Sequence, residues 1–286
     1  MVRFKRDPGG PGQVIDRRGS GTALRFGAGG GGIALVVVLL LTLFGGGSDF
    51  GPLLDSLSGS GQVAPAADPI DPENDPDADL VGFLEDVLED SQAMWVSVFQ
   101  ESNLDYQPTN LVVFNGFTQS GCGGAQAQSG PHYCPLDGLV YMDLDFLRLL
   151  QDRFDAAGDT AQAYILAHEV AHHVQNQLGI IDEVTRLGQS EPDRANDLSI
   201  SLELQADCFA GVWLSTLRDG TSAAILEEND LQEALDAAAA VGDDAIQQQT
   251  SGSVNPESWT HGSSEQRFQW LKTGFDTGDP TACDTF

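Results

Sequence analysis

Basic residues are scarce in this chain of 286 residues. Lys and Arg together number 13, against 43 Asp and Glu, which gives a formal net charge of −30 at pH 7. A nucleic-acid-binding surface needs a basic face to meet the phosphates, so this composition predicts no nucleic-acid partner. We interpret the acidity as a soluble, self-repelling surface rather than as a site for one cationic substrate.

Cysteine is also scarce, with four residues in the chain. An even number is typical of disulfide pairing in an oxidising compartment. We expect one bridge between Cys122 and Cys134, which close a glycine-containing loop, and a second between Cys208 and Cys283. Four free buried thiols are the alternative, and the spacing does not match a zinc knuckle.

One apolar run stands out, at residues 33–44. With the uncharged glycines around it, the run approaches the ~20 residues that cross a bilayer. Six basic and two acidic residues precede it, a net charge of +4, and almost no charge follows directly. This asymmetry orients the N-terminus toward the cytoplasm.

A cleaved signal peptide is the alternative for this run. We favour a signal anchor, because the basic leader is long and no small-x-small cleavage site follows closely. The predicted organisation is a basic cytoplasmic arm at 1–25, a transmembrane signal anchor at 26–47, a disordered linker at 48–79 and one extracytoplasmic domain at 80–286.

The hydrophobic pattern of the domain predicts an α+β fold, mainly helical with a small sheet. Strands are expected at 111–114 and 139–144. Helices are expected at 80–102, 145–154, 159–179, 195–217, 223–240, 243–249 and 264–275.

The helix at 159–179 carries the pattern His168-Glu169-x-x-His172. Asp159 is expected to cap its N-terminus and Gly179 to end it. On a helix the two histidines lie one turn apart on one face, so both rings can bind one zinc ion. Glu169 projects at an adjacent angle and can reach a metal-bound water. Since three fixed residues also occur together by chance, the motif needs a third ligand from elsewhere.

A second helix supplies acids at the same spacing. Glu203 and Asp207 are four residues apart among apolar neighbours, so we expect them to face inward, where a cation must compensate them. Glu203 is the expected third ligand, and Asp207 the acceptor that orients the ring of His168. The alternatives are that Asp207 binds the metal with Glu203 outside, or that both acids face solvent.

A third segment contains His261 and Arg267. His261 is the expected donor to the oxyanion of a tetrahedral intermediate, with an ordinary loop histidine as the alternative. Arg267 is expected to orient the acids or to bind a substrate carboxylate, and Ser263 or Ser264 to cap the last helix.

Three further side chains bear on the site. His173 lies about 100° around the helix from His172, so we interpret it as structural. The pattern leaves the role of His132 open. Tyr141 lies on the strand at 139–144, which is expected to hold a peptide by edge pairing, and its hydroxyl is a candidate to assist His261.

These motifs, in this order, resemble the gluzincin metallopeptidases with an ExxAD helix. The fuller strings HEVAHHVQ, ELQADCFAG and HGSSEQR, with CG and GPxYCP around the first cysteine pair, resemble the family described as "putative neutral zinc metallopeptidase". The similarity covers residues 80–286, with Gly262 where the integral-membrane gluzincins have proline. A third histidine of the metzincin kind is absent from 174–181. The resemblance implies zinc endopeptidase chemistry on a zincin-like α+β scaffold.

The sequence therefore predicts a membrane-anchored, extracytoplasmic peptidase that acts on a peptide or protein. One zinc ion is held by His168, His172 and Glu203, with one position open for water, and Glu169 is the general base. The alternative is a non-catalytic binding or assembly module of the cell envelope with a structural zinc. An inactive peptidase-like partner of a membrane enzyme is a third possibility.

Overall fold

The computed structural model describes residues 10–18, 70–71, 73–123, 130–148, 158–218, 226–227 and 229–286. These residues form the predicted α+β fold, mainly helical with a four-stranded sheet. The strands are β1 (Val14–Asp16), β2 (Leu111–Phe114), β3 (His132–Cys134) and β4 (Leu139–Asp143). The α-helices are α3 (Ala78–Glu101), α6 (Asp159–Gln177), α7 (Ile180–Ser190), α8 (Ala195–Arg218), α9 (Asp230–Ala240), α10 (Asp243–Ser251) and α11 (Ser264–Thr277).

Most predicted elements are found near their expected bounds. Residues 144–148 are helical, and the rest of the helix expected at 145–154 lies outside the described residues. The sequence reasoning missed β1, β3 and α7. The apolar segment at 26–47 also lies outside the described residues, and within the described ranges no helix is long and apolar enough to cross a bilayer.

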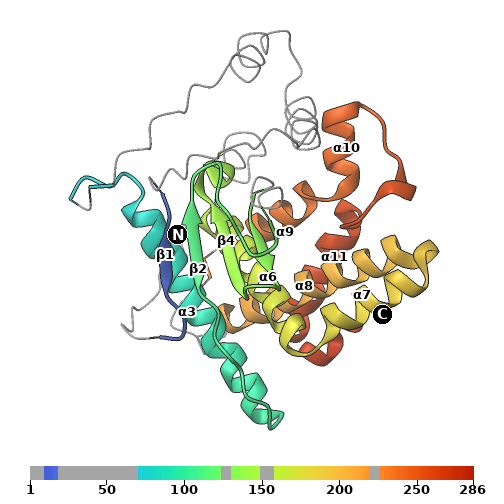
Figure 1. The fold of residues 1–286 in the computed structure, drawn as a ribbon, viewed down its shortest axis with the longest axis horizontal. Helices are drawn as coiled ribbons and strands as arrows, with labels where there is room; N and C mark the ends of the chain where they lie inside the picture. The colour runs from blue at the N-terminus through green and yellow to red at the C-terminus, as the bar shows by residue number, and fades with distance from the viewer. Residues whose placement is uncertain are drawn as a thin grey trace.

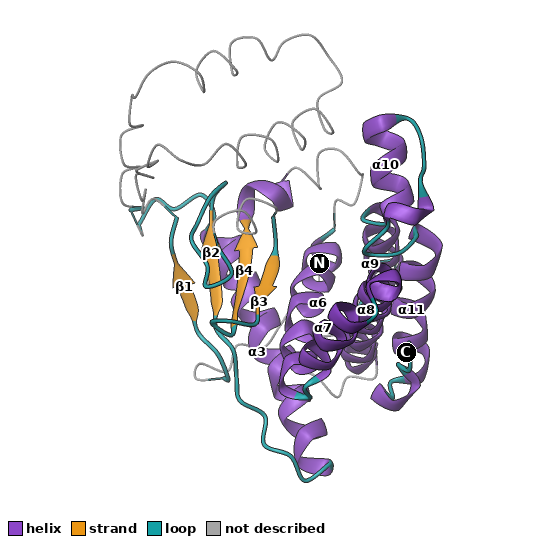
Figure 2. Cartoon of the chain, turned by 45° about the vertical axis from the view of Figure 1, so that its right-hand side comes forward, coloured by secondary structure: helices purple, strands orange, loops and turns teal. Residues whose placement is uncertain are grey.

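The sheet has the strand order β1-β2-β4-β3 (Figure 2). β1, β2 and β4 run parallel, and β3 pairs antiparallel with β4. Because β4 has a partner on both sides, it is not the edge strand that the sequence predicted for peptide pairing. On the side nearer α6, the edge of the described sheet is β3.

The two faces of the sheet differ in what covers them. Leu111 and Val113 of β2 belong to the main core, whereas the alternate residues Val112 and Phe114 belong to a smaller cluster with Cys134. This alternation is the two-residue period of a strand. All four of these β2 side chains are fully buried, which explains why β2 reads as a continuous apolar run.

Residues 10–18 are part of the domain rather than a separate arm. β1 pairs with β2 along its length, and the backbone N–H of Arg17 donates to the carbonyl oxygen of Val113 at 2.9 Å. The side chain of Arg18 is 3% exposed and lies 2.7 Å from Asp16 and 2.7 Å from Asp75. Arg18 thus joins the segment before residue 19 to the segment after residue 70.

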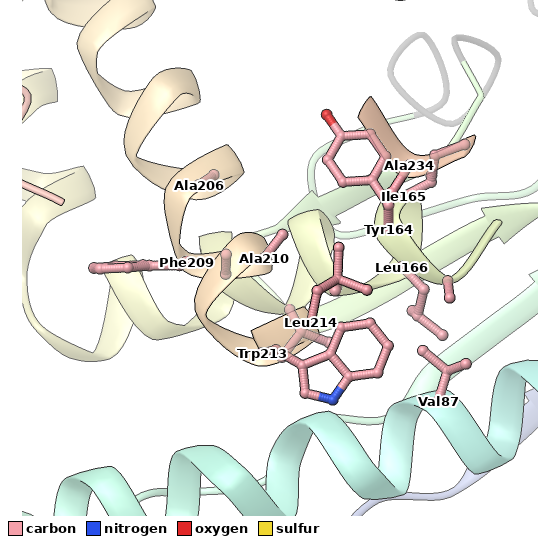
Figure 3. Close-up of a cluster of buried hydrophobic side chains, with 14 of the residues drawn as sticks. Val87, Tyr164, Ile165, Leu166, Ala206, Phe209, Ala210, Trp213, Leu214 and Ala234 are labelled. Atoms are coloured by element: carbon pink, nitrogen blue, oxygen red, sulfur yellow. The ribbon is translucent and has the colours of Figure 1, made fainter. Parts of the chain in front are cut away.

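The helices form layers beside the sheet. Figures 1 and 2 show α6 next to the sheet, with α8, α9 and α11 beyond it. Trp213 of α8 is fully buried and lies between α8 and α3, where its Nε1 donates to Oδ2 of Asp90 at 2.9 Å (Figure 3). This core fixes α6 against α8, the two helices that carry the HExxH and ExxAD motifs.

Both predicted disulfides are confirmed. Cys122 is bonded to Cys134, with Cα atoms 5.7 Å apart, and Cys208 to Cys283, with Cα atoms 5.6 Å apart. All four cysteines are therefore used in bridges. The first bridge ties the loop before β3 to β3 itself, and the second ties the C-terminal segment to α8.

Candidate metal centre

The HExxH motif lies in the middle of α6. The helix begins one residue earlier than the capping prediction requires: Gly158, in an extended conformation, is the N-cap, and Asp159 is already helical. The expected side-chain cap by Asp159 is therefore wrong. Gly179 does follow the helix end with φ of 75°, as expected for a C-terminal glycine.

His168, His172 and Glu203 come together between α6 and α8. Nε2 of His168 lies 3.2 Å from Oε2 of Glu203, and Nε2 of His172 lies 3.5 Å from Oε1 of the same carboxylate. A tetrahedral zinc with bonds of ~2.0–2.1 Å separates neighbouring ligand atoms by about 3.3 Å. The two rings and the carboxylate therefore fit one zinc ion with little rearrangement.

The remaining chemistry of the residues also suits zinc. All three ligand candidates are largely buried, and two imidazoles with one carboxylate are a donor set found in catalytic zinc sites. Glu169, the neighbour of His168 on α6, is 8% exposed. Since the four cysteines are in disulfides, none can act as a ligand.

Asp207 lies behind His168, on the side away from Glu203. Its Oδ1 is 2.8 Å from Nδ1 of His168 and accepts the hydroxyl of Tyr164 at 2.6 Å. Arg267 donates to both oxygens of Asp207, from Nε at 2.8 Å and from a terminal nitrogen at 2.9 Å. The network holds the His168 ring with Nδ1 toward Asp207 and Nε2 toward Glu203.

This network also decides what Arg267 can do. Its side chain is 5% exposed and forms a bidentate ion pair with Asp207, whose side chain is fully buried. Of the two predicted roles, orienting the acids therefore agrees with the geometry. Binding a substrate carboxylate does not, because that would leave the buried Asp207 without its cation.

Protons and a metal ion compete for the nitrogens of this site. Burial alone would lower the pKa of His168, but the charge of Asp207 and the hydrogen bonds with Asp207 and Glu203 raise it to about 10. Burial likewise opposes ionisation of Asp207, but Arg267 and His168 outweigh it and lower the pKa of Asp207 to about 2. Because zinc binds neutral imidazole, we expect metal binding to release a proton.

His261 lies in a loop that Asp243 organises. Oδ2 of Asp243, at the start of α10, accepts the backbone N–H groups of Thr260 and His261 at 2.7 Å each and of Gly262 at 3.1 Å. Oδ1 of Asp243 is 3.3 Å from Nδ1 of His261. Ser263 caps α11 through a capping box with Gln266, which agrees with one of the two predicted caps.

The pKa of His261 is raised. Burial opposes the charged form, but the hydrogen bond with Asp243 and the charge of Glu203 favour it more strongly. Half of the side chain, 51%, is exposed to solvent. The negative charges of Asp243 and Glu203 thus both favour the protonated form of His261.

The other histidines have structural contacts. His173 is buried, with Nε2 at 2.7 Å from the carbonyl oxygen of Gln107 and Nδ1 at 3.1 Å from the hydroxyl of Tyr133, as expected for a structural residue. His132 stacks on Tyr141, with ring centroids 4.8 Å apart. The hydroxyl of Tyr141 donates to Asp137 at 2.8 Å, and its suggested assistance to His261 stays a prediction.

A second group of acids lies at the N-terminus of α6. Within the described residues, Asp159, Asp230 and Glu233 form this group, and it contains no histidine. The backbone N–H of Thr160 bonds to Glu233. Negative charge at a helix N-terminus is favourable, so this group has a structural explanation in the helix dipole.

The sequence reasoning missed three residues of the site. Tyr164 precedes His168 by one helical turn, and Gln175 follows His172 by three residues, so each lies on the metal-facing side of α6. That shared face was the signal that could have found them. Asp243 had no such signal, because it is 18 residues from His261 in the chain.

The site thus combines two histidines on one helix, a glutamate and an aspartate on a second, and a buried arginine on a third, and it is a candidate metal centre. The chain belongs to the family described as "Putative neutral zinc metallopeptidase", which matches residues 3–286.

The chain is similar to curated proteins of Escherichia coli and of Mycobacterium species. The uncharacterized protein YpfJ of Escherichia coli (strain K12) is 48% identical over 205 residues, which are 71% of this chain and 70% of that protein. The uncharacterized protein Rv2575 of Mycobacterium tuberculosis (strain ATCC 25618 / H37Rv) is 46% identical over 189 residues, 63% of each chain. No solved structure matches the chain.

Proposed function

We propose that this protein is a zinc-dependent endopeptidase whose single zinc ion is held by His168, His172 and Glu203. The observation that carries the proposal is the shared carboxylate of Glu203, which lies 3.2 Å from one imidazole and 3.5 Å from the other. When bound, the ion supplies a Lewis acid that polarises a carbonyl and lowers the pKa of water.

Three protein ligands leave one position for water or substrate. In the part of the chain that the structure describes, no fourth His, Cys, Asp or Glu joins this group. A purely structural zinc site is closed by four protein ligands. The open position therefore favours the peptidase over the alternative, a non-catalytic cell-envelope module with a structural zinc.

Glu169 is the proposed general base. It follows His168 directly on α6 and is 8% exposed, so its side chain is shielded from bulk solvent. In the proposed mechanism Glu169 takes the proton of the attacking water and returns it to the leaving amine. Both proton transfers need the carboxylate within hydrogen-bonding reach of the reacting atoms.

His261 is the proposed donor to the oxyanion. Asp243 holds its Nδ1 side, which leaves Nε2 for the developing negative charge. Asp207 and Arg267 do not touch substrate in this proposal. They orient His168 and balance its charge from behind.

The substrate is proposed to be a peptide or protein in extended conformation. β3 is the edge of the described sheet on the side nearer α6, and the hydroxyl of Tyr133 on β3 accepts from Asn176 of α6 at 2.9 Å. A strand at an edge offers free backbone groups to which an extended peptide can pair. We therefore transfer the proposed pairing role from β4 to β3.

The proposal is tested with Glu169→Gln. The variant keeps every proposed ligand, so we expect it to bind one zinc per chain and to lose at least about 100-fold in peptide hydrolysis, the lower range for a general base. Cleavage is measured from the new termini that the wild type and the variant produce in a protein mixture. Equal cleavage by both forms would exclude Glu169 as the base.

Location is a separate proposal. The two disulfides support a compartment outside the cytoplasm, and membrane attachment through 26–47 remains a prediction. A single crossing at 26–47 would place residues 10–18 and the domain on opposite sides of the bilayer. β1 could not then pair with β2, nor Arg18 with Asp75, so that orientation and the paired sheet exclude each other.

A further inference from the structure

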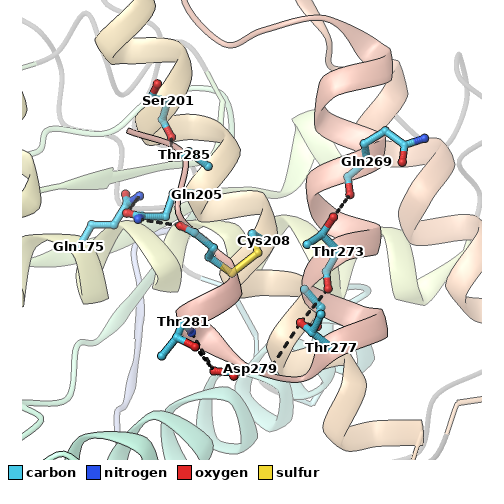
Figure 4. Close-up of a disulfide and its surroundings, with 12 residues drawn as sticks. Gln175, Ser201, Gln205, Cys208, Gln269, Thr273, Thr277, Asp279, Thr281 and Thr285 are labelled. Carbon is cyan, nitrogen blue, oxygen red and sulfur yellow. Dashed lines mark hydrogen bonds between the residues drawn. A yellow bond between two sulfur atoms is a disulfide. The ribbon is translucent and has the colours of Figure 1, made fainter.

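His172 is held from behind by a chain of two glutamine amides. Its Nδ1 lies 2.8 Å from Oε1 of Gln175. Nε2 of Gln175 donates to Oε1 of Gln205 at 3.1 Å, and Nε2 of Gln205 donates to the carbonyl oxygen of Cys283 at 3.0 Å (Figure 4). Gln175 is fully buried and Gln205 is 7% exposed, so water does not compete for these bonds.

Backbone carbonyls determine which atom donates and which accepts in each of these hydrogen bonds. A carbonyl only accepts, so Gln205 must present its amide nitrogen to Cys283 and its oxygen to Gln175. Gln175 must then present its nitrogen to Gln205 and to the carbonyl oxygen of Leu202, which is 2.8 Å away. The amide oxygen of Gln175 is left for His172, whose Nδ1 must donate.

The proton on Nδ1 determines what the other nitrogen can do. With Nδ1 protonated, the neutral ring carries its lone pair on Nε2, which is the atom that faces Glu203 at 3.5 Å. That tautomer is the one a metal ion at the centre requires. The opposite tautomer would place two acceptors, Nδ1 and the Gln175 oxygen, against each other.

A disulfide holds the segment that carries the last acceptor of this hydrogen-bond series, the carbonyl of Cys283. Cys283 is bonded to Cys208 on α8, and the hydroxyl of Thr285 donates to the carbonyl oxygen of Ser201 at 2.6 Å (Figure 4). The carbonyl of Cys283 therefore stays where Gln205 needs it. The two ligating histidines thus differ in support, because His168 bonds to a carboxylate and His172 to a neutral amide.

We propose that Gln175 is a positioning residue of the metal centre, which holds His172 in the zinc-binding tautomer and is itself oriented, through Gln205, by the carbonyl of Cys283. The inference rests on the metal site of the proposed function but not on its peptidase activity. It assigns a role in zinc binding to the disulfide-bound C-terminal segment.

The test uses the full-length protein, with zinc as the only added ligand and no peptide substrate. Zinc Kd values are measured by competition with a coloured chelator for the wild type, Gln175→Ala, Gln205→Leu and a control, Gln162→Ala, on the same helix. The tautomer of His172 in the metal-free proteins is read from the nitrogen chemical shifts of its ring by NMR. Thermal unfolding checks that each variant is folded.

We expect Gln175→Ala to weaken zinc binding by roughly 10- to 100-fold and to give a mixture of His172 tautomers. Gln205→Leu leaves Gln175 in place and should show a smaller change of the same kind, while Gln162→Ala should match the wild type. If Gln175→Ala does not fold, Gln205→Leu carries the same test.

Two results would overturn the inference. One is a zinc Kd within twofold of the control in both variants, and the other is weaker binding with an unchanged tautomer, which indicates a packing role. Neither result bears on Glu169, so the peptidase proposal would stand. A wild type that binds no zinc would overturn both.

Discussion

The close crossing of α8 and α11 is what brings Arg267 to Asp207, and it depends on two glycines. A Cβ added at Gly274 would lie 1.9 Å from the carbonyl oxygen of Cys208, and one at Gly211 would lie 2.1 Å from the carbonyl oxygen of Leu271. The atoms in the way are backbone, which cannot rotate aside. We predict that Gly274→Ala forces the helices apart by at least about 1 Å.

The magnitude follows from that displacement. Overpacking of a core by one methyl group costs typically 1–3 kcal/mol, and because backbone must move here we expect about 3 kcal/mol. For a domain of this size that lowers the Tm by roughly 6–12 °C. The shift also withdraws the Arg267 side chain from Asp207, so zinc affinity should fall with stability.

A matched control is Gly188→Ala on α7. A Cβ there would meet only Ala195, at 3.7 Å, which is ordinary contact, and alanine favours the helix by about 0.5–1 kcal/mol. Thermal unfolding of both variants is the assay. A Tm for Gly274→Ala within about 2 °C of the wild type would refute the close crossing. If Gly188→Ala lowered the Tm as much as Gly274→Ala does, any added alanine would disturb the fold and the comparison would not support the crossing.

Two further predictions concern His261 and the N-terminal strand. Because the pKa of His261 is raised, the imidazolium persists above the ordinary pKa of histidine and is lost as the pH rises through the raised value. Asp243→Asn, with Glu203 and Arg267 unchanged, should therefore move the alkaline limb of the kcat/KM profile to lower pH. An unmoved limb would show that the protonation of His261 does not control the rate. The pairing of β1 with β2 and the ion pairs of Arg18 require residues 10–18 and the rest of the domain to lie on the same side of a membrane. In sealed vesicles, we therefore expect a protease to digest tags at both ends of the full chain from the same side. Protection of one tag alone would contradict that pairing.

The sequence predicted the centre of the site because the information there is local. His168 and His172, and likewise Glu203 and Asp207, are one helical turn apart, so a single period places each pair on one face. The apolar neighbours of Glu203 left it little solvent face, and the structure has it largely buried between the two rings. The even cysteine count indicated two disulfides, and the short loop between Cys122 and Cys134 indicated their pairing.

The parts that failed depend on tertiary pairing. β1 and β3 have three residues each, too few to show a two-residue period, and β1 pairs with a strand about 97 residues away. Missing β3 made β4 look like an edge strand. Asp243 and His261 meet only because α10 and the loop before α11 fold together, which no spacing in the chain reveals.

The zinc content of the purified wild type and of Glu203→Ala tests the central claim most directly. Among the described residues, Glu203 is the acid that lies near both rings, so its replacement removes a proposed ligand and should leave two imidazoles that bind zinc weakly. We predict one zinc per chain in the wild type and a loss of most of it in Glu203→Ala, with the fold retained through Asp207 and Arg267. An unchanged zinc content in the variant would contradict the account.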